Sequence, residues 1–157
     1  MRSGRNGYTQ IKERMHRMPA LTRREEREEI FRLLFETEFH GTLTPEEIYD
    51  LAVDAREIPE SKYIRQVYFG VQEKKEELDA FISAHSNGWR PDRIAPVSRS
   101  ILRLGIYEMK YADDVPPAVA INEAVELTKK FDEEKARSFI NGVLNGVKNE
   151  LEAPKKD

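Results

Sequence analysis

Apolar residues recur at intervals of three and four positions along most of this chain, which is the spacing of one face of an α-helix. The first such stretch, about 22–40, begins at Thr22, a suitable N-cap, and ends before Gly41. No stretch alternates convincingly as a half-buried β-strand does. Further helices are predicted from Thr44 to about Ala55, over 61–84, from Pro96 onward, over 117–131 and over 133–150.

Local signals mark several of these helix boundaries. The sequence TPEE at 44–47 combines a capping box with proline at the first helical position. Asp132, followed by two glutamates, suits the start of the last helix. The stretch 61–84 predicts either one kinked helix or two in succession, and 86–91 has the composition of a loop. The pattern therefore predicts six or seven helices.

The helix that begins near Pro96 is apolar around most of its circumference, so we place it at the centre of the fold. A chain of 157 residues suits one ordinary domain. We therefore predict an all-α fold, namely a compact single domain of six to seven helices. It is expected to consist of two packed helical subsets that share the central helix.

Charge is distributed unevenly along the chain. Residues 1–24 carry a net charge of +6, which leaves −9 for the remainder because the whole chain carries −3. We predict a flexible basic leader over 1–20, the helical domain over 21–151 and a frayed tail over 152–157. The basic start suggests contact with a polyanion, and a solvated arm without a ligand is the alternative.

Several classes of site are excluded or unsupported by the sequence. The chain has no cysteine, which excludes disulfides and thiolate chemistry. His16, His40 and His85 lack the spacing of metal ligands, and no Gly-rich phosphate loop follows a strand. No apolar run approaches the roughly 20 residues that cross a bilayer. We expect a soluble, cytoplasmic binding protein that is not an enzyme and holds no metal or cofactor.

Arginines gather where the first helix begins. On a helix Arg23 and Arg27 lie on one face, four residues apart, with Arg24 beside them. Three guanidinium groups in one patch suit the phosphates and base edges of a nucleic acid. The alternative is that Arg23 and Arg27 pair with neighbouring glutamates.

Two C-terminal segments are more specific than apolar spacing alone. INEAVEL at 121–127 and FINGVLN at 139–145 resemble the bacterial NusB family, as do LRLGIYEM at 102–109 and the arginine-rich start of the first helix. The resemblance implies an all-helical factor that recognises boxA, a short single-stranded RNA element of ribosomal RNA leaders. It further implies action with NusE, a small-subunit ribosomal protein, by which the transcription elongation complex resists termination.

The resemblance also implies which residues contact the RNA. The three arginines at 23, 24 and 27 would share an RNA surface with Lys135 and Phe139 at the start of the last helix. Phe139 would stack on a base, a contact worth roughly 1–3 kcal/mol. Packing in the core is the alternative for Phe139, because it shares a helix face with Val143 and Val147.

A surface for the protein partner is expected near the entry to the central helix, at Asp92, Arg93 and Ser98, where an acid could meet a basic ribosomal protein. Self-association to a homodimer stays open. The alternative function is a helical protein-interaction module of the same fold without boxA affinity. A fragment of an RNA methyltransferase, a class in which NusB-like domains also occur, is a third reading with less support.

Five further residues of the family-like segments are expected to have structural roles. Asn122 and Asn141 would join helices through amide hydrogen bonds, and Gly142 would allow a close helix approach. Arg103 and Glu108 are expected to tie helices together by charge. We predict no RNA contact for any of the five.

Overall fold

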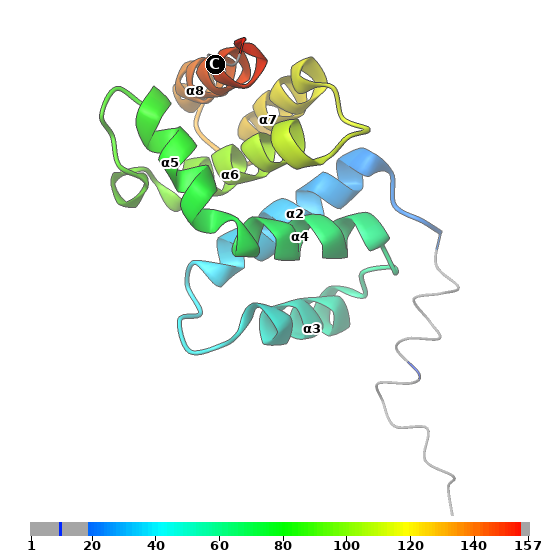
Figure 1. The fold of residues 1–157 in the computed structure, drawn as a ribbon. Helices are drawn as coiled ribbons and strands as arrows, with labels where there is room; N and C mark the ends of the chain where they lie inside the picture. Colours follow the sequence, from blue (N-terminus) through cyan, green and yellow to red (C-terminus); the bar gives the residue numbers. More distant parts are fainter. Residues whose placement is uncertain (1–9, 11–18, 155–157) are drawn as a thin grey trace, which may run out of the picture. The chain divides into compact units, whose positions relative to one another are not determined.

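Seven α-helices and one short 3-10 helix form the part of the chain that the structure, a computed structural model, describes, namely Gln10 and residues 19–154 (Figure 1). No strand occurs among these residues, so the predicted all-α fold is confirmed. Most of the predicted leader and residues 155–157 of the predicted tail lie outside the described residues. The elements are α2 (Arg23–Thr37), α3 (Pro45–Arg56), α4 (Lys62–Glu73), α5 (Lys75–His85), η1 (Pro91–Arg93), α6 (Pro96–Tyr111), α7 (Pro117–Phe131) and α8 (Ala136–Glu152).

The chain divides into two compact units, residues 1–66 and 67–157. The division falls inside α4, whereas we expected two helical subsets to share the helix that begins at Pro96. In the second unit α6 packs against α5, α7 and α8, and residues 101–108 of α6 are all buried. The apolar circumference of α6 thus reflects contact with several helices, and such a pattern does not indicate where one subset ends.

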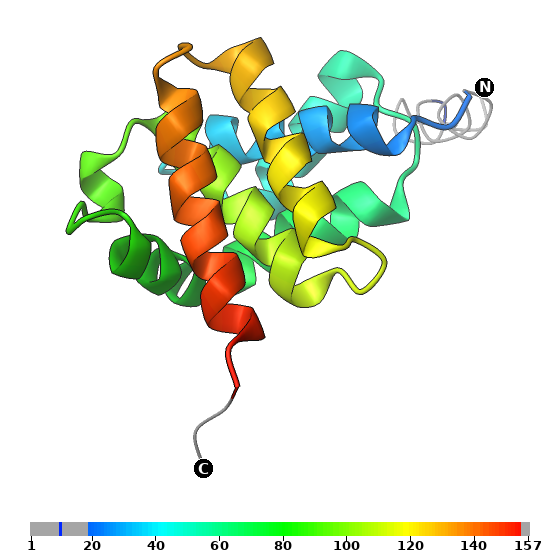
Figure 2. The ribbon, with the colours of Figure 1, turned by 90° about the horizontal axis from the view of Figure 1, so that it is seen from above.

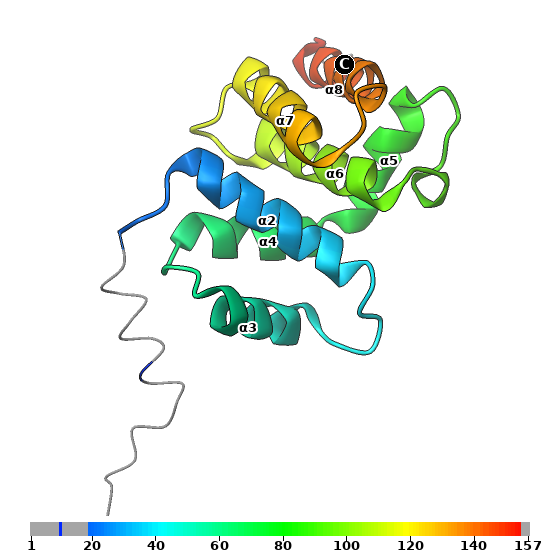
Figure 3. The same cartoon turned by 180° about the vertical axis from the view of Figure 1, so that it is seen from behind.

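In the first unit α2 and α3 pack together and are joined by residues 38–44 (Figure 3). Both helices begin with the predicted capping box. The Thr22 hydroxyl accepts a hydrogen bond from the Glu25 amide at 3.1 Å, and the Glu25 carboxylate accepts one from the Thr22 amide at 2.9 Å. Thr44 and Glu47 form the same pair of bonds at 3.2 and 3.3 Å. Each box satisfies two amides at or beside a helix start, where backbone N–H groups lack helical partners.

The stretch 61–84, which crosses the division between the units, resolves into two helices in succession, since α4 ends at Glu73 and α5 begins at Lys75. The helices α7 and α8 lie side by side (Figure 2), and both contact α6. The buried face of α8 follows the three-and-four spacing that the sequence predicted. It consists of Ile140, Val143, Leu144 and Val147.

The turn between α7 and α8 departs from the prediction that the last helix begins at about 133. The helix α8 begins at Ala136, and no side chain caps its start. Asp132 instead ends α7 in extended backbone, where its carboxylate accepts hydrogen bonds from the Glu133 amide at 2.8 Å and from the Ser98 hydroxyl at 2.6 Å. Because both oxygens of Asp132 have these partners, the first turn of α8 forms without it.

Candidate nucleic-acid interface

The arginines at the start of α2 do not form one exposed patch. The Arg23 guanidinium lies 3.5 Å from the centre of the Tyr63 ring and pairs with Glu26 at 3.2 Å. Arg24 is exposed, whereas Arg27 is buried with 5 % of its surface accessible. The alternative of pairing with a neighbouring glutamate therefore holds for Arg23, and only Arg23 and Arg24 reach the solvent.

The start of α8 carries an exposed cation. The Lys135 side chain is 86 % exposed and pairs with Glu133, itself 71 % exposed, at 3.2 Å. Ion pairs this exposed contribute little to stability, so the ammonium group can exchange its carboxylate for another anion at little cost. This agrees with the expectation that Lys135 is exposed and leaves its contact with RNA a prediction.

Phe139 lies at the edge of the buried face of α8. Its side chain is partly buried, while Val143 and Val147, which share its face, are 2 % and 0 % exposed. The ring is thus neither fully packed in the core nor free on the surface. Base stacking and core packing therefore both stay open as predictions for Phe139.

Two of the three residues predicted to contact a protein partner, Asp92 and Arg93, are exposed in the segment before α6, and the third, Ser98, lies inside α6. Asp92 is 63 % exposed and pairs with Arg90, 69 % exposed, at 3.1 Å, and Arg93 is also exposed. Ser98 is only 6 % exposed, and its hydroxyl donates to Asp132. Ser98 therefore holds α6 to the α7–α8 turn, and a partner would reach Asp92 and Arg93 without touching it.

Sequence reasoning missed Trp89, which is 55 % exposed in the same loop. The backbone around it is fixed, because the Trp89 amide bonds the Ser86 carbonyl at 3.1 Å and the buried Ser86 hydroxyl donates to the Trp89 carbonyl. Arg99 donates to two further carbonyls of the loop, those of Pro91 and Ile94, each at 2.9 Å. An exposed tryptophan beside arginines is the residue composition that protein interfaces favour, and this was the signal available in the sequence.

A family model settles the relationship of this chain to known proteins. The model described as the NusB family matches residues 24–149, which is most of the chain. This chain belongs to the NusB family. The resemblance inferred from the INEAVEL and FINGVLN segments is thereby confirmed.

Relatives of known function in the NusB family match nearly their whole length. The transcription antitermination protein NusB of Bacillus pumilus is 43 % identical over 131 residues, which cover 83 % of this chain and 98 % of that protein. The protein of the same name from Myxococcus xanthus is 41 % identical over 138 residues, covering 84 % and 98 %. The family consists of antitermination factors and not of enzymes, so the prediction that this chain is not an enzyme is confirmed.

Solved NusB structures have the same fold. The NusB structure of T. maritima superimposes with a TM-score of 0.77 at 30 % identity, over 84 % of this chain and 94 % of that one. A chain from a crystal structure of NusB and NusE in complex with dsRNA gives a TM-score of 0.72 at 29 % identity, over 80 % and 94 %. The predicted NusB-like helical fold is confirmed by both.

Three residues by which the chain resembles the NusB family are placed differently from our expectation. Asn122 and Asn141 are exposed, and Asn141 bonds only within α8, where the Asn145 amide donates to its carbonyl and side-chain oxygens at 2.9 and 3.2 Å. Gly142 is exposed, and a Cβ built on it would meet no atom within 4 Å. The expected roles in joining helices are therefore wrong, because these positions face outward from α7 and α8.

Arg103 was predicted to tie helices together by its charge, and the structure confirms this. The buried Arg103 guanidinium binds both carboxylate oxygens of Asp79, at 2.8 and 3.0 Å, and so joins α6 to α5. Glu108 is 1 % exposed. Hydrogen bonds from Lys110, and secondarily from Tyr111, hold the pKa of the Glu77 carboxyl below its usual value and join the same two helices.

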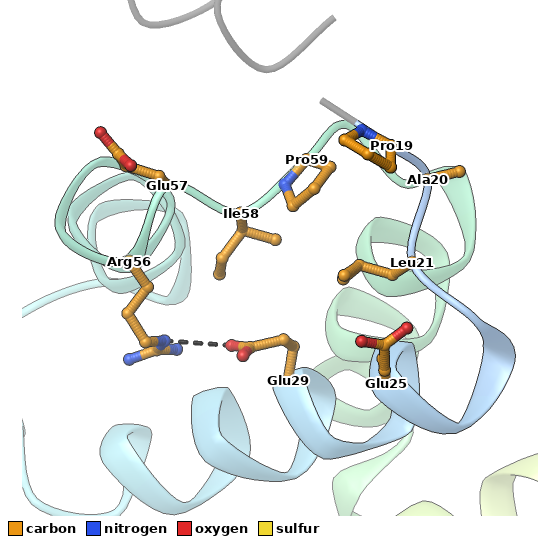
Figure 4. Close-up of a pocket in the computed structure, with 9 residues that line it drawn as sticks. All are labelled: Pro19, Ala20, Leu21, Glu25, Glu29, Arg56, Glu57, Ile58 and Pro59. Carbon is orange, nitrogen blue, oxygen red and sulfur yellow. Dashed lines mark hydrogen bonds and ion pairs between the residues drawn. The ribbon is translucent and has the colours of Figure 1, made fainter. Parts of the chain in front are cut away.

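A pocket of about 400 Å³ opens in the first unit, lined by residues 19–21 and 56–59 together with Glu25 and Glu29 (Figure 4). Its charged groups bind one another, since Arg56 pairs with Glu29 at 3.0 Å and also with Glu36. Glu25 belongs to the capping box of α2. The charges of this pocket therefore act mainly to hold α3 against α2.

Two kinds of site receive no support from the residues that the structure describes. No group of three or more histidine, aspartate and glutamate side chains is arranged to hold a metal ion. Of the described helices, none has the length and apolar character needed to span a membrane. His85 contacts Glu150 at 3.3 Å, and His16 lies outside the described residues.

Proposed function

We propose that this chain binds a boxA-type single-stranded RNA of ribosomal RNA leaders together with a NusE-type ribosomal protein, in the cytoplasm, and so supports transcription antitermination. The observation that carries the proposal is its membership of the NusB family at more than 40 % identity over nearly the full length of relatives. A solved relative is in complex with NusE and dsRNA, which supports a NusE-type protein and an RNA as the two ligands. A homodimer and contact with the elongation complex belong to the same proposal.

Exposed cations at two helix starts support the RNA contact. Arg24 at the start of α2 and Lys135 at the start of α8 are exposed and can neutralise phosphates. Arg23 has its guanidinium stacked on Tyr63 and paired with Glu26, so an RNA phosphate would have to compete with that carboxylate. Phe139, four residues after Lys135 in the sequence, is partly exposed. Arg27 is buried, so its guanidinium is not presented to the solvent as that of Arg24 is.

The test measures fluorescence anisotropy of a labelled boxA-like RNA and of a scrambled control, each titrated with the protein alone and with the NusE-type partner at several salt concentrations. We expect preference for the boxA-like RNA, and tighter binding with the partner. Replacing Arg24 or Lys135 by alanine should each lower the log–log salt slope by about 0.7, the share of one phosphate contact on a single strand. Arg90→Ala, which removes an exposed cation from the α5–α6 loop, is the control in the titration with the protein alone, since Arg90 pairs with Asp92 of the proposed partner surface.

Equal binding of both RNAs in the presence of a formed protein complex would favour the alternative, an interaction module without boxA affinity. Partner binding can be followed separately, because Trp89 is the only tryptophan of the chain and lies three residues from Asp92. With a tryptophan-free partner, burial of this loop should shift the emission of Trp89 to shorter wavelength and reduce quenching by acrylamide. If the emission of Trp89 did not change when the complex formed, the partner would bind at a surface other than Asp92 and Arg93.

A further inference from the structure

Four glycines lie inside the described helices, and three of them have a visible reason. A Cβ on Gly70 would lie 2.1 Å from the Tyr107 hydroxyl oxygen, one on Gly105 3.2 Å from Leu144, and one on Gly146 2.6 Å from the His85 ring. A Cβ at Gly70 or Gly146 would thus force the neighbouring ring to shift, and one at Gly105 would be a tight contact with the Leu144 side chain. These contacts are made within the second unit.

Gly142 differs from the other three. A Cβ built there meets nothing within 4 Å, and Gly142 is not among the residues with positive φ. A glycine inside a helix lowers helix stability relative to alanine, since it has more backbone entropy to lose on folding. Neither packing within the described residues nor backbone geometry compensates for this loss at Gly142. The remaining use of a missing side chain is close approach by another molecule.

The residues around Gly142 indicate what kind of molecule this is. Asn141 is exposed, and the bonds it receives from Asn145 leave its own NH₂ group without a partner among the described residues. One turn earlier, the Nε of Arg137 is buried and likewise has no hydrogen-bond partner in the described part of the chain. The exposed Asn141 amide therefore offers both a donor and an acceptor to a ligand, whereas the buried Arg137 Nε is out of a ligand's reach.

We propose that an unstacked RNA base approaches the backbone of α8 at Gly142 and that the Asn141 side chain pairs with the edge of this base. An asparagine amide offers a donor and an acceptor side by side, as needed to read a base edge. The Phe139 ring and the Lys135 charge lie within the same two turns. An exposed cation together with an amide that can pair with a base edge favours RNA over a protein surface. The proposal rests on the proposed function, whose RNA contact at Lys135 and Phe139 it extends.

The decisive variant is Gly142→Ala, because its two effects have opposite signs. Alanine should stabilise α8 and raise Tm by about 2–4 °C, the shift that a helix-propensity gain produces in a chain of this size. The added methyl group should nevertheless weaken binding of the boxA-like RNA about tenfold. Loss of affinity in a variant that melts at higher temperature cannot be ascribed to misfolding.

Asn141→Ala tests base reading. It should reduce the preference for the boxA-like RNA over the scrambled control while leaving the salt slope unchanged, since no phosphate contact is removed. Asn149→Ala, an exposed asparagine two turns further along α8, is the matched control and should bind as the wild type does. The three variants together separate the surface at Gly142 from α8 in general.

The outcomes distinguish this inference from the proposed function. Wild-type preference for the boxA-like RNA with unaltered binding by Gly142→Ala and Asn141→Ala would overturn the inference and leave the proposed function standing. Loss of partner binding with RNA binding intact would assign the surface to a protein and would also overturn it. If the wild type shows no RNA preference, both proposals fail together.

Discussion

The first turns of α2 and of α8 carry the same kinds of residue, yet they use them in different ways. At α2 a capping box satisfies the backbone, Arg23 is stacked on Tyr63 and paired with Glu26, and Arg27 is buried. At α8 no side chain caps the helix, Lys135 is 86 % exposed and the Nε of Arg137 has no partner among the described residues.

This difference teaches that the density of charge in a sequence is a poor guide to which charges are available to a ligand. The start of α2 has the more basic sequence, but packing within the chain occupies much of its charge. The start of α8 has fewer charges, and among the described residues Lys135 has only an exposed pairing with Glu133 and the Nε of Arg137 has no partner. A ligand gains most from groups that the fold leaves unsatisfied, because no existing interaction must be broken first.

The largest test of this comparison is Arg27→Ala. Removal of a buried arginine leaves a cavity and polar neighbours without their partner, so the free energy of unfolding should fall by about 2–3 kcal/mol. Arg24→Ala, which removes an exposed arginine from the same helix, should change it by less than about 0.5 kcal/mol. Urea titration followed by circular dichroism measures both. If Arg27→Ala kept its stability and lost its affinity for RNA, Arg27 would act in RNA binding and not in stabilising the fold.

A second test compares two glycines of α8 itself. Gly146→Ala places a methyl group 2.6 Å from the His85 Nδ1 and 3.2 Å from its Cβ, too close for the ring to turn away. Overpacking should outweigh the gain in helix propensity and destabilise the protein by about 1–2 kcal/mol. Gly142→Ala should change stability in the opposite direction. Thermal unfolding of the two variants under the same conditions measures the two shifts in Tm. Equal shifts would show that the different surroundings of Gly142 and Gly146 do not affect stability.

Much of the fold could be predicted from the sequence because its signals are local. Thr22 and Thr44 each lie three residues before a glutamate, and the capping boxes they predict form as expected. Prolines at 96 and 117 fix the first residues of α6 and α7. The division inside α4 and the delayed start of α8 were missed, since both depend on contacts between residues distant in sequence, such as Ser98 with Asp132.

The candidate site could be predicted less well, because side-chain exposure is set by packing. Arg24 and Arg27 differ in sequence position by three residues and in nothing else that a pattern reveals, yet one is exposed and the other buried. Asn141 and Gly142 suggested contacts between helices, because small and amide residues often occur where two helices pack together. Only the surrounding structure shows that at Gly142 nothing approaches.

The smallest effects compare the two helix starts directly. Thr22→Ala removes the capping hydroxyl and breaks the reciprocal bond of Glu25, so unfolding should become about 1 kcal/mol easier. Lys135→Ala removes a side chain whose one pairing is highly exposed, and stability should change by less than about 0.5 kcal/mol. Differential scanning calorimetry at low and high salt measures both variants. The contrary result is that Lys135→Ala loses as much free energy of unfolding as Thr22→Ala, and loses it only at low salt. That result would show that the Lys135 charge stabilises the start of α8 as the Thr22 cap stabilises the start of α2. Equal stability of Lys135→Ala and the wild type at both salts would leave Lys135 available for a phosphate.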